Sequence, residues 1–288
     1  MLDRRIDASS KRFAVLGESL PHTWSPYIHN SVFAAAGRNA VYLPITVPKD
    51  QLGSVADVFR SCFDGFNVTI PYKERIIPFL DEVDDAVRAC GAVNTVEVRD
   101  GRLIGHITDG LGMLTAIEEA GISTQAVHTL ILGGGGAARV AGYEFLSRGG
   151  RITLAVRNVE KGNILAAELA DSQPDGMARI EVCSLSHILE SGYDILVNCT
   201  PVGMYPHIHD CPVTDNVIAH CGAVFDAVYN PRVTRLLASA ESLHIPCVEG
   251  LGMLFYQAVA AQQFWFGRDI GVSQAGLSAI YAGLREQL

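Results

Sequence analysis

A glycine-rich turn after a short apolar run is the feature that most constrains how this chain of 288 residues can fold. Residues 133–138 read Gly-Gly-Gly-Gly-Ala-Ala and directly follow the mostly apolar segment 129–132. Gly133, Gly135 and Ala138 match the GxGxxA pattern. In that pattern the first glycine allows a tight turn, the second lets phosphates approach the backbone, and the small residue permits close packing of helix on strand. The turn therefore predicts a dinucleotide whose pyrophosphate rests on free N–H groups at a helix start.

The segments after this turn alternate as a sheet with crossover helices requires. Apolar runs at 151–156, 194–199 and 223–228 are expected to form the second, third and fourth strands. Helical stretches lie between the first three of these four strands. A further strand is expected at 245–248. This part of the chain is therefore predicted to be a Rossmann-type nucleotide-binding domain.

The chain before the glycine-rich turn has an α/β pattern of its own. Strands are expected at 13–17, 41–45 and 65–70, with helices from Pro26 and near 52–59.

After the nucleotide-binding part, the apolar residues of the terminal helix recur at helical spacing. They are Leu254, Ala258, Ala261 and Trp265. We expect this helix to pack back on the first domain. The predicted fold class is therefore α/β with two α/β domains. The N-terminal substrate domain comprises 1–109 plus 250–288, and the dinucleotide-binding Rossmann domain comprises 110–249. A cleft between two such domains is a natural ligand site.

Composition narrows the class of partner. A formal net charge of -9 argues against nucleic acid and against an anionic membrane surface as partners. No apolar run approaches about 18 residues, and the first dozen residues contain no signal-peptide core. Seven scattered cysteines without CxxC spacing favour free thiols in a reducing compartment and no metal site. We therefore expect a cytoplasmic protein with a small-molecule ligand.

Several polar clusters in the first domain allow either chemistry or a local structural role. Ser25 is expected to be an N-cap before Pro26, where its hydroxyl and that of Thr23 could bind a carboxylate. Taken alone, this segment favours a role for Ser25 only as a helix cap. Lys73 follows a strand that Pro71 ends, and it could be only a solvated lysine.

Strand alternation places Asn67 and Thr69 on one face of that strand. Asn94 follows small residues and could be only a turn former, and Asp109 lies in a segment that could be only a helix cap. No single cluster decides between the two interpretations.

Taken together and in order, these motifs resemble those of the shikimate dehydrogenase family, including its shikimate/quinate 5-dehydrogenase-like members. The resemblance covers nearly the whole chain and depends on motif order and spacing. It is carried by Ser25-Pro26, residues 67–74, 91–95, 108–110, 133–138, 198–204 and 226–231, Thr234, residues 250–254 and Gln257.

The resemblance implies an enzyme that reversibly reduces 3-dehydroshikimate to shikimate by hydride transfer, in chorismate and aromatic amino acid biosynthesis. NADP is the expected cofactor, with NAD as the alternative. By position, Lys73 and Asp109 match the catalytic pair of the family. Its substrate contacts are matched by Thr23, Ser25, Asn67, Thr69, Asn94, Tyr229 and Gln257. A lysine held near a carboxylate can take the proton of an alcohol that loses hydride.

Charge after the second strand of the nucleotide-binding domain favours NADP. An NAD-specific site would place an acid there for the ribose, but the strand ends Val156-Arg157-Asn158 and no acid occurs before Glu160. Arg157, with Lys161 and Arg139, can bind a 2′-phosphate. The expected cofactor contacts are Gly133, Gly134, Gly135, Gly136, Ala137, Ala138, Arg139, Arg157, Asn158, Lys161, Thr200, Gly250 and Met253.

Four positions depart from the family pattern. Thr23 replaces a usual serine, Ile107 replaces an asparagine, and the Asn-Arg-Thr segment is Val156-Arg157-Asn158. Met204 is followed by Tyr205-Pro206. These departures leave open a quinate/shikimate dehydrogenase or a relative acting on an amino-substituted substrate. A non-catalytic ligand sensor of the same fold is a further alternative, and the sequence allows a monomer or a homodimer.

Overall fold

The computed structural model describes residues 6–21, 23–173, 175–190 and 192–287. The chain divides into two compact units, one of Met1–Thr108 with Gln257–Leu288 and one of Asp109–Tyr256. Helix α9 (Gly250–Phe266) begins in the second unit and ends in the first. The boundaries expected from the sequence, 109/110 and 249/250, lie one and seven residues from these divisions.

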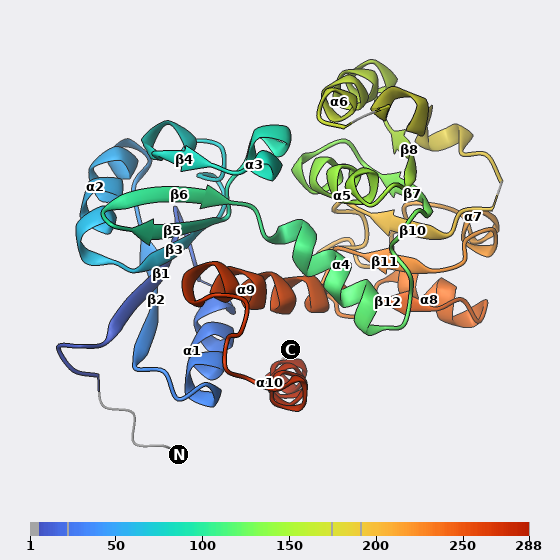
Figure 1. Cartoon of the computed structure of the whole chain (residues 1–288). Coiled ribbons are helices and arrows are strands. Elements are labelled where there is room, and N and C mark those ends of the chain that lie inside the picture. The colour runs from blue at the N-terminus through green and yellow to red at the C-terminus, as the bar shows by residue number, and fades with distance from the viewer. Residues whose placement is uncertain (1–5, 22, 174, 191, 288) are drawn as a thin grey trace. The chain divides into compact units, whose positions relative to one another are not determined.

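The first unit contains a mixed six-stranded sheet in the order β2-β1-β3-β5-β6-β4. β1 pairs in parallel with β2 and β3, whereas β5 runs antiparallel to both β3 and β6. Figure 1 shows β5 and β6 side by side, joined through Asp100 and Gly101 with positive φ angles of 52° and 74°. Such angles suit a two-residue hairpin turn. The strands are Lys11–Gly17, Ala40–Thr46, Gly65–Val68, Glu82–Val83, Thr95–Arg99 and Arg102–His106.

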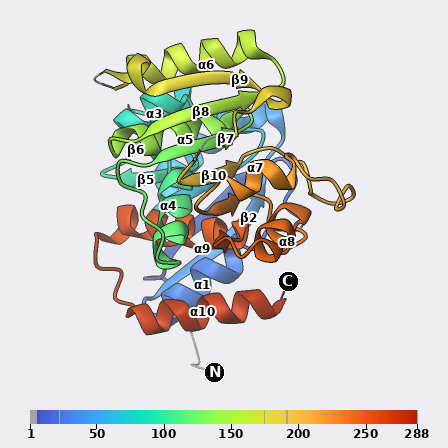
Figure 2. The same cartoon turned by 90° about the vertical axis from the view of Figure 1, so that its right-hand side faces the viewer.

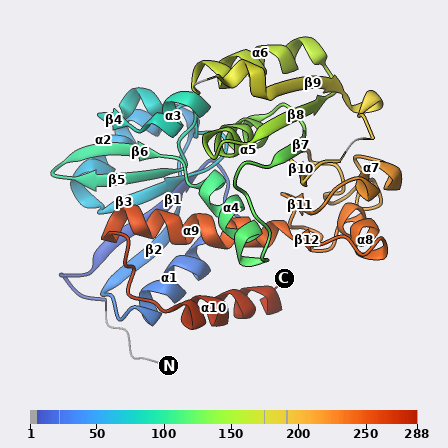
Figure 3. The same cartoon turned by 45° about the vertical axis from the view of Figure 1, so that its right-hand side comes forward.

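Helices from both the N-terminal and the C-terminal parts of the chain pack in this unit. Trp265, near the end of α9, stacks on Phe13 of β1 and donates to the Val96 carbonyl of β5 at 3.0 Å. The C-terminal helix α10 packs along α1, as Figure 3 shows. These contacts confirm that the C-terminal segment packs on the first domain, although α10 itself was not predicted. The helices are α1 (Ser25–Ala35), η1 (Lys49–Gln51), α2 (Leu52–Cys62), η2 (Ile77–Phe79), α3 (Asp85–Cys90) and α10 (Gln274–Gln287).

The second unit is built on a parallel six-stranded sheet in the order β12-β11-β10-β7-β8-β9. Numbered within the unit and read from β9, this order is 3-2-1-4-5-6, the Rossmann order, with its switch point between β7 and β10. The predicted Rossmann class is confirmed. The strands are His128–Leu132, Arg151–Val156, Ile180–Ser184, Ile195–Asn198, Val224–Asp226 and Cys247–Val248.

Both faces of this sheet carry helices. Leu130, Leu196 and Val224 of the sheet pack with Ile218 of α7 and Leu237 of α8 in one buried cluster. Helix α5 packs on β7 and β8, and α6 covers β8 and β9, as Figure 2 shows. The helices are α4 (Asp109–Glu119), α5 (Gly136–Ser147), α6 (Val159–Asp171), η3 (Gly176–Arg179), η4 (Leu185–His187), α7 (Asp215–Ala219) and α8 (Arg235–Ser242).

Two strand predictions need correction. The segment 194–199 is not the third strand of its sheet, because β9 (Ile180–Ser184) comes before it. β9 is a half-buried edge strand and lacks the long apolar run that marks an inner strand. Strand β3 ends at Val68 rather than at residue 70. The backbone turns at Thr69, whose carbonyl accepts from the Tyr72 N–H at 2.9 Å.

None of the helices in the described part of the chain combines the length and the apolar character that crossing a bilayer requires. The same residues contain no cluster of three or more His, Cys, Asp or Glu side chains placed to hold a metal ion.

Candidate active site

The glycine-rich turn lies where the sheet of the second unit changes direction. Gly133, directly after β7, has a φ of 112°, and a Cβ there would lie 3.2 Å from Thr200 Cγ2 and 3.3 Å from the Cys199 carbonyl oxygen. Only glycine adopts this backbone at such close approach without strain. The loops after β7 and β10 therefore meet at the carboxyl edge of the sheet, where Rossmann sheets bind dinucleotides.

The remaining loop residues leave space for a ligand. A Cβ added at Gly135 or Gly136 would meet no other heavy atom within 4 Å, and both residues are exposed. Ala137 is also exposed, whereas Ala138 is fully buried against the sheet. The loop thus exposes its backbone at the start of α5. Backbone N–H groups in this position bind an anion.

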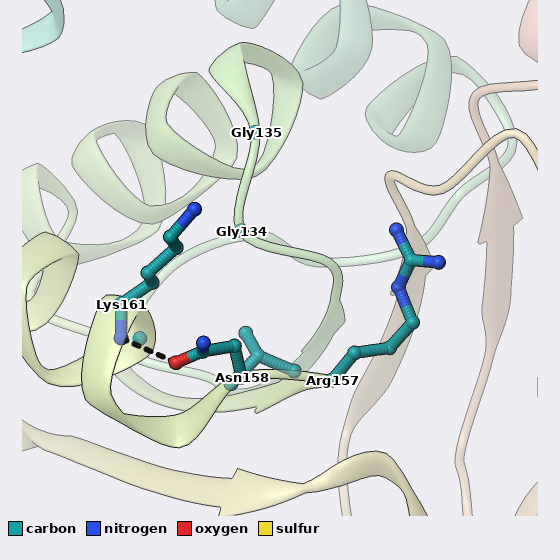
Figure 4. A pocket seen from close by; sticks show the side chains of 7 residues that line it. Gly134, Gly135, Arg157, Asn158 and Lys161 are labelled. Atoms are coloured by element: carbon teal, nitrogen blue, oxygen red, sulfur yellow. Dashed lines mark hydrogen bonds between the residues drawn. The ribbon is translucent and has the colours of Figure 1, made fainter.

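A pocket of about 530 Å³ adjoins this loop. In Figure 4 the side chains of Arg157 and Lys161 extend on opposite sides of the Gly134–Gly135 segment. Both cations are exposed, and the end of β8 that lines the pocket carries no acid. The lining is Gly134, Gly135, Val156, Arg157, Asn158, Lys161 and Gly162.

Two residues expected to contact the cofactor already have structural partners. Asn158 is the N-cap of α6, and its side chain accepts from the Lys161 backbone N–H at 2.9 Å. The guanidinium of Arg139 forms an ion pair with Glu168 of α6. Asn158 therefore holds Lys161 at the pocket, while Arg139 is engaged by a carboxylate.

A buried carboxylate organises the loops beyond β10 and β11. Asp226 accepts from Asn198 Nδ2 at 2.9 Å and from Thr234 Oγ1 at 2.6 Å. Burial raises the pKa of Asp226, and these hydrogen bonds oppose the shift. Asn198 Oδ1 in turn accepts from the Thr200 hydroxyl at 2.7 Å. Asn198 and Asp226 fall within the motifs of the family resemblance, but their role in anchoring Thr200 was not predicted from the sequence.

Three other residues expected to contact a ligand come after strands of the second unit. Tyr229 is 38% exposed in the loop after β11. Gly250 begins α9, and a Cβ there would lie 2.6 Å from the Ala227 carbonyl oxygen, so this glycine permits close packing. Met253, one turn into α9, is half-buried.

The first unit brings three expected substrate residues together by hydrogen bonds. Asn67 Nδ2 donates to the Asn94 carbonyl oxygen at 3.0 Å, and Asn94 Nδ2 lies 3.5 Å from Gln257 Oε1. Asn94 Oδ1 also accepts from the Thr108 backbone N–H at 2.8 Å. The three amides are 5%, 3% and 8% exposed, respectively. They form a preorganised amide cluster at the ends of β3 and β5 and on α9.

Lys73 and Thr69 lie on the segment that follows β3. The Lys73 carbonyl accepts from the Val93 N–H at 2.8 Å, which fixes this segment beside the residues before β5. The Thr69 N–H donates to the Leu16 carbonyl of β1 at 2.9 Å. Both side chains are half-buried. Asp109, also half-buried, is the first residue of α4 in the second unit.

The expected role of Ser25 as a helix cap is wrong. The N-cap of α1 is Trp24 and Ser25 is already helical, with no side-chain hydrogen bond capping the helix. Its backbone N–H instead lies 3.4 Å from Thr23 Oγ1. Pro26 fits the first turn as predicted, but the helix begins one residue earlier than expected. His22, the start of this motif, lies outside the described residues.

Two buried residues beneath the amide cluster were missed from the sequence. The Tyr42 hydroxyl donates to Asn67 Oδ1 at 2.6 Å, and the His29 ring stacks on the Tyr42 ring with centroids 4.1 Å apart. The sequence pattern predicts Tyr42 only as a further apolar residue of a strand and His29 only as a residue of a helix. Nothing in the sequence shows that Tyr42 and His29 each lie near a polar side chain of another element.

The departures from the family pattern lie in different environments. Ile107 is 3% exposed and buried, so an apolar side chain occupies the position of the usual asparagine. Val156 lines the pocket beside the glycine loop. Tyr205 is 70% exposed, and its N–H donates to the Asn230 carbonyl at 3.2 Å, joining the loops after β10 and β11.

Comparison with known proteins agrees with this arrangement. Residues 15–96 match a family model described as the shikimate dehydrogenase substrate binding domain. A shikimate dehydrogenase (NADP(+)) from Symbiobacterium thermophilum is 39% identical over 264 residues, which cover 88% of each chain. This chain belongs to the shikimate dehydrogenase family.

Solved structures of the family share the fold. A shikimate dehydrogenase in complex with NADP+ has a TM-score of 0.88 at 35% identity, covering 99% of each chain. The shikimate 5-dehydrogenase of Thermus thermophilus, in complex with NADP(H) and shikimate, has a TM-score of 0.84 at 30% identity. That match covers 96% of this chain and 100% of the other.

Proposed function

We propose that this protein is an NADP-dependent shikimate dehydrogenase that reversibly reduces 3-dehydroshikimate to shikimate, within chorismate and aromatic amino acid biosynthesis. The observation that carries the proposal is the similarity, over most of both chains, to proteins named for this activity. A phosphate-binding loop at the Rossmann switch point and a buried amide cluster in the first unit support it.

Lys73 and Asp109 are the residues that we propose handle the proton. When bound, the nicotinamide supplies or accepts the hydride at the ring carbon. Lys73 takes the hydroxyl proton as shikimate is oxidised and returns it in the reverse direction. Asp109 is the carboxylate that we assign to orient the Lys73 side chain for this transfer.

The amides of the first unit and its hydroxyl groups bind the ring acid. Ring hydroxyls need both donors and acceptors, which Asn67, Asn94 and Gln257 provide. Thr69 of the same unit adds a hydroxyl group. Tyr229 belongs to the second unit and is assigned to the substrate by its position in the family motif. The substrate carboxylate is an acceptor only, and the hydroxyls of Thr23 and Ser25 are the donors that we assign to it.

The cofactor choice follows from the pocket beside the glycine loop. A 2′-phosphate needs cations and the absence of a nearby acid. Arg157 and Lys161 both line the pocket, and the sequence after β8 reaches its first acid at Glu160. Arg157 offers a planar fork that suits phosphate, and Lys161 adds a point charge. NADP is therefore preferred to NAD.

Two alternatives concern substrate and turnover. Thr23 adds a methyl group and Ile107 removes a polar side chain, so quinate or an amino-substituted ring acid is the second candidate substrate. A non-catalytic sensor is disfavoured, because binding a neutral hydroxyl does not require both Lys73 and Asp109.

We further propose a cytoplasmic protein without nucleic acid or membrane partners, which the negative charge and composition support. We propose that it is a monomer or a homodimer.

Product analysis tests the proposal. Shikimate and NADP+ incubated with the protein should give 3-dehydroshikimate and NADPH in equal amounts, and the Lys73→Ala variant serves as the matched control. Ligand-induced thermal stabilisation without any cofactor reduction by shikimate, quinate or an amino analogue would favour the sensor.

A further inference from the structure

Asn67 is held by three hydrogen bonds from within its own unit. Its Nδ2 donates to the Asn94 carbonyl oxygen at 3.0 Å and to Thr95 Oγ1 at 2.9 Å. Its Oδ1 accepts from the Tyr42 hydroxyl at 2.6 Å. The Asn67 side chain thus touches β2, β5 and the residue before β5, and it is 5% exposed.

These bonds fix which end of the amide can meet a ligand. An amide nitrogen carries two hydrogens, and both are used by protein acceptors. The reversed amide is excluded, because a carbonyl oxygen of Asn94 cannot donate to Oδ1. Oδ1 accepts from the Tyr42 hydroxyl and also interacts with the His29 imidazole, and an amide oxygen can accept more than one hydrogen bond. Any ligand contact of Asn67 therefore uses Oδ1, and the ligand must be the donor.

Tyr42 is itself held by buried groups. His29 is 0% exposed and stacks on Tyr42 with an interplanar angle of 10°. Gln262 Nε2 lies 3.2 Å from His29 Nδ1, so α9 supports the imidazole. Burial lowers the pKa of His29 to about 3, with an interaction with Asn67 opposing the shift. Burial also raises the pKa of Tyr42, although a hydrogen bond with Ser25 opposes it. Around neutral pH the His29 imidazole is therefore uncharged, and the Tyr42 hydroxyl keeps its proton.

We propose that Tyr42 is a positioning residue that fixes Asn67 as a hydrogen-bond acceptor, so that the site selects a hydroxyl donor of the ligand at this point. The inference rests on the proposed function for the identity of that ligand, a polyhydroxylated ring acid. Because 3-dehydroshikimate must also bind, this hydroxyl is one that the reaction leaves unchanged. A ligand with a keto or methoxy group in its place leaves two acceptors facing each other, and it is rejected for that reason.

A double-mutant cycle on Tyr42 and Asn67 tests the coupling. Tyr42→Phe removes one hydroxyl and keeps the ring that stacks on His29. It should raise KM for shikimate roughly threefold to tenfold and leave kcat within about twofold, because one neutral hydrogen bond is lost. In an Asn67→Ala background the same change should have almost no further effect on KM. An equal rise in KM in both backgrounds, or a fall in kcat alone, overturns the proposal.

A matched control separates positioning from general loss of a buried hydroxyl. Tyr72 is also fully buried, and its hydroxyl donates to the Val47 carbonyl within the same unit. Tyr72→Phe should cost similar thermal stability while KM for shikimate stays within about twofold. A Tyr72→Phe rise in KM equal to that of Tyr42→Phe would show that the effect is only structural.

Ligand analogues keep the test decisive if Asn67→Ala does not fold. The dissociation constants of shikimate and its three monodeoxy analogues are measured by calorimetry on the parent and on Tyr42→Phe. One analogue should bind the parent roughly tenfold more weakly than shikimate and lose most of that difference in the variant. Discrimination that is unchanged in Tyr42→Phe for all three analogues overturns the proposal.

These binding measurements require no turnover. An inactive parent that shows the predicted discrimination therefore refutes the proposed function and leaves the role of Tyr42 standing. An active parent without this discrimination refutes the role of Tyr42 alone.

Discussion

The two candidate ligand-binding regions of the molecule differ in the groups that form them. The amide cluster of the first unit is made of side chains, and Asn67, Asn94 and Gln257 are each less than one tenth exposed. The pocket of the second unit is made of exposed backbone at Gly134 and Gly135 and exposed cations such as Lys161. Buried amides are fixed by their partners before a ligand arrives, whereas N–H groups of a loop and flexible cations bind any suitably placed phosphate.

This difference predicts how each region responds to substitution. A change in the amide cluster leaves other buried polar atoms without partners, so it should alter stability and substrate recognition together. A change of an exposed cation at the pocket should alter cofactor affinity and leave stability almost unchanged.

The largest effect is expected at Lys73. Lys73→Ala should lower kcat about 100-fold or more, the range typical of removing a positioned acid or base, with a smaller effect on the KM of shikimate. Steady-state kinetics at saturating NADP+ measures it. Asp109→Ala should lower kcat by a similar factor. The double variant should lose little more than either single variant, because the two residues act together in one step. A kcat close to that of the parent in Lys73→Ala would remove Lys73 from the mechanism.

A smaller effect is expected at Ser25, where the structure separates binding from helix capping. Ser25→Ala should raise KM for shikimate about tenfold or more, because a hydrogen bond to a charged carboxylate is lost. Since Ser25 does not cap α1, any loss of thermal stability should come from its hydrogen bond with Tyr42 and not from the removal of a helix cap. A drop in stability with unchanged KM would reverse this assignment.

Arg157 tests the exposed region directly. Arg157→Ala should raise KM for NADP+ about tenfold and leave KM for NAD+ nearly unchanged, because only NADP+ carries the 2′-phosphate. Its melting temperature should match that of the parent. Arg151→Ala is the matched control. Arg151 is an exposed residue at the start of β8, whereas Arg157 directly follows the end of β8. Equal losses with both cofactors would contradict a phosphate contact.

The buried region should also respond to pH through His29. Its folded pKa of about 3 lies below the ordinary histidine value of 6.5. Its contribution to stability is therefore complete above pH 6.5 and is lost as the pH falls towards 3, because the unfolded chain then binds the extra proton. The expected slope is about 1.4 kcal/mol per pH unit.

Chemical denaturation of the parent and of His29→Gln at about pH 6 and about pH 5, both within this window, isolates the contribution. The parent should lose about 1.2 kcal/mol more than the variant between the two pH values, slightly less than the full slope because the unfolded histidine is already partly protonated at pH 6. The same loss in both proteins would show that His29 is not buried in the neutral form.

The sequence predicted those parts of the molecule that depend on local pattern. The strand 151–156 and the glycine loop were predicted from apolar runs and small residues, and both are confirmed. Strand β9 was missed, because a short edge strand buries only part of its side chains. The first residue of α1 was misjudged, because serine is common both at the N-cap and in the first turn.

The side chains of the site show the same division. Asn67 and Asn94 are evident as polar residues at strand ends, and their motif order revealed the family. The support from Tyr42 and His29 depends on packing between β2, α1 and β3, and no spacing along the chain encodes it. Tertiary contacts of this kind follow from the fold and become visible only with coordinates.

We infer that this chain oxidises shikimate with NADP+. The most direct test of this inference compares kcat/KM for shikimate and for quinate, each with NADP+ and with NAD+, using one preparation of the protein. We expect the highest kcat/KM for shikimate with NADP+, at least about tenfold above that for shikimate with NAD+, because NADP+ makes one charge-assisted phosphate contact more. A higher value for quinate, or for NAD+ with either acid, would contradict it.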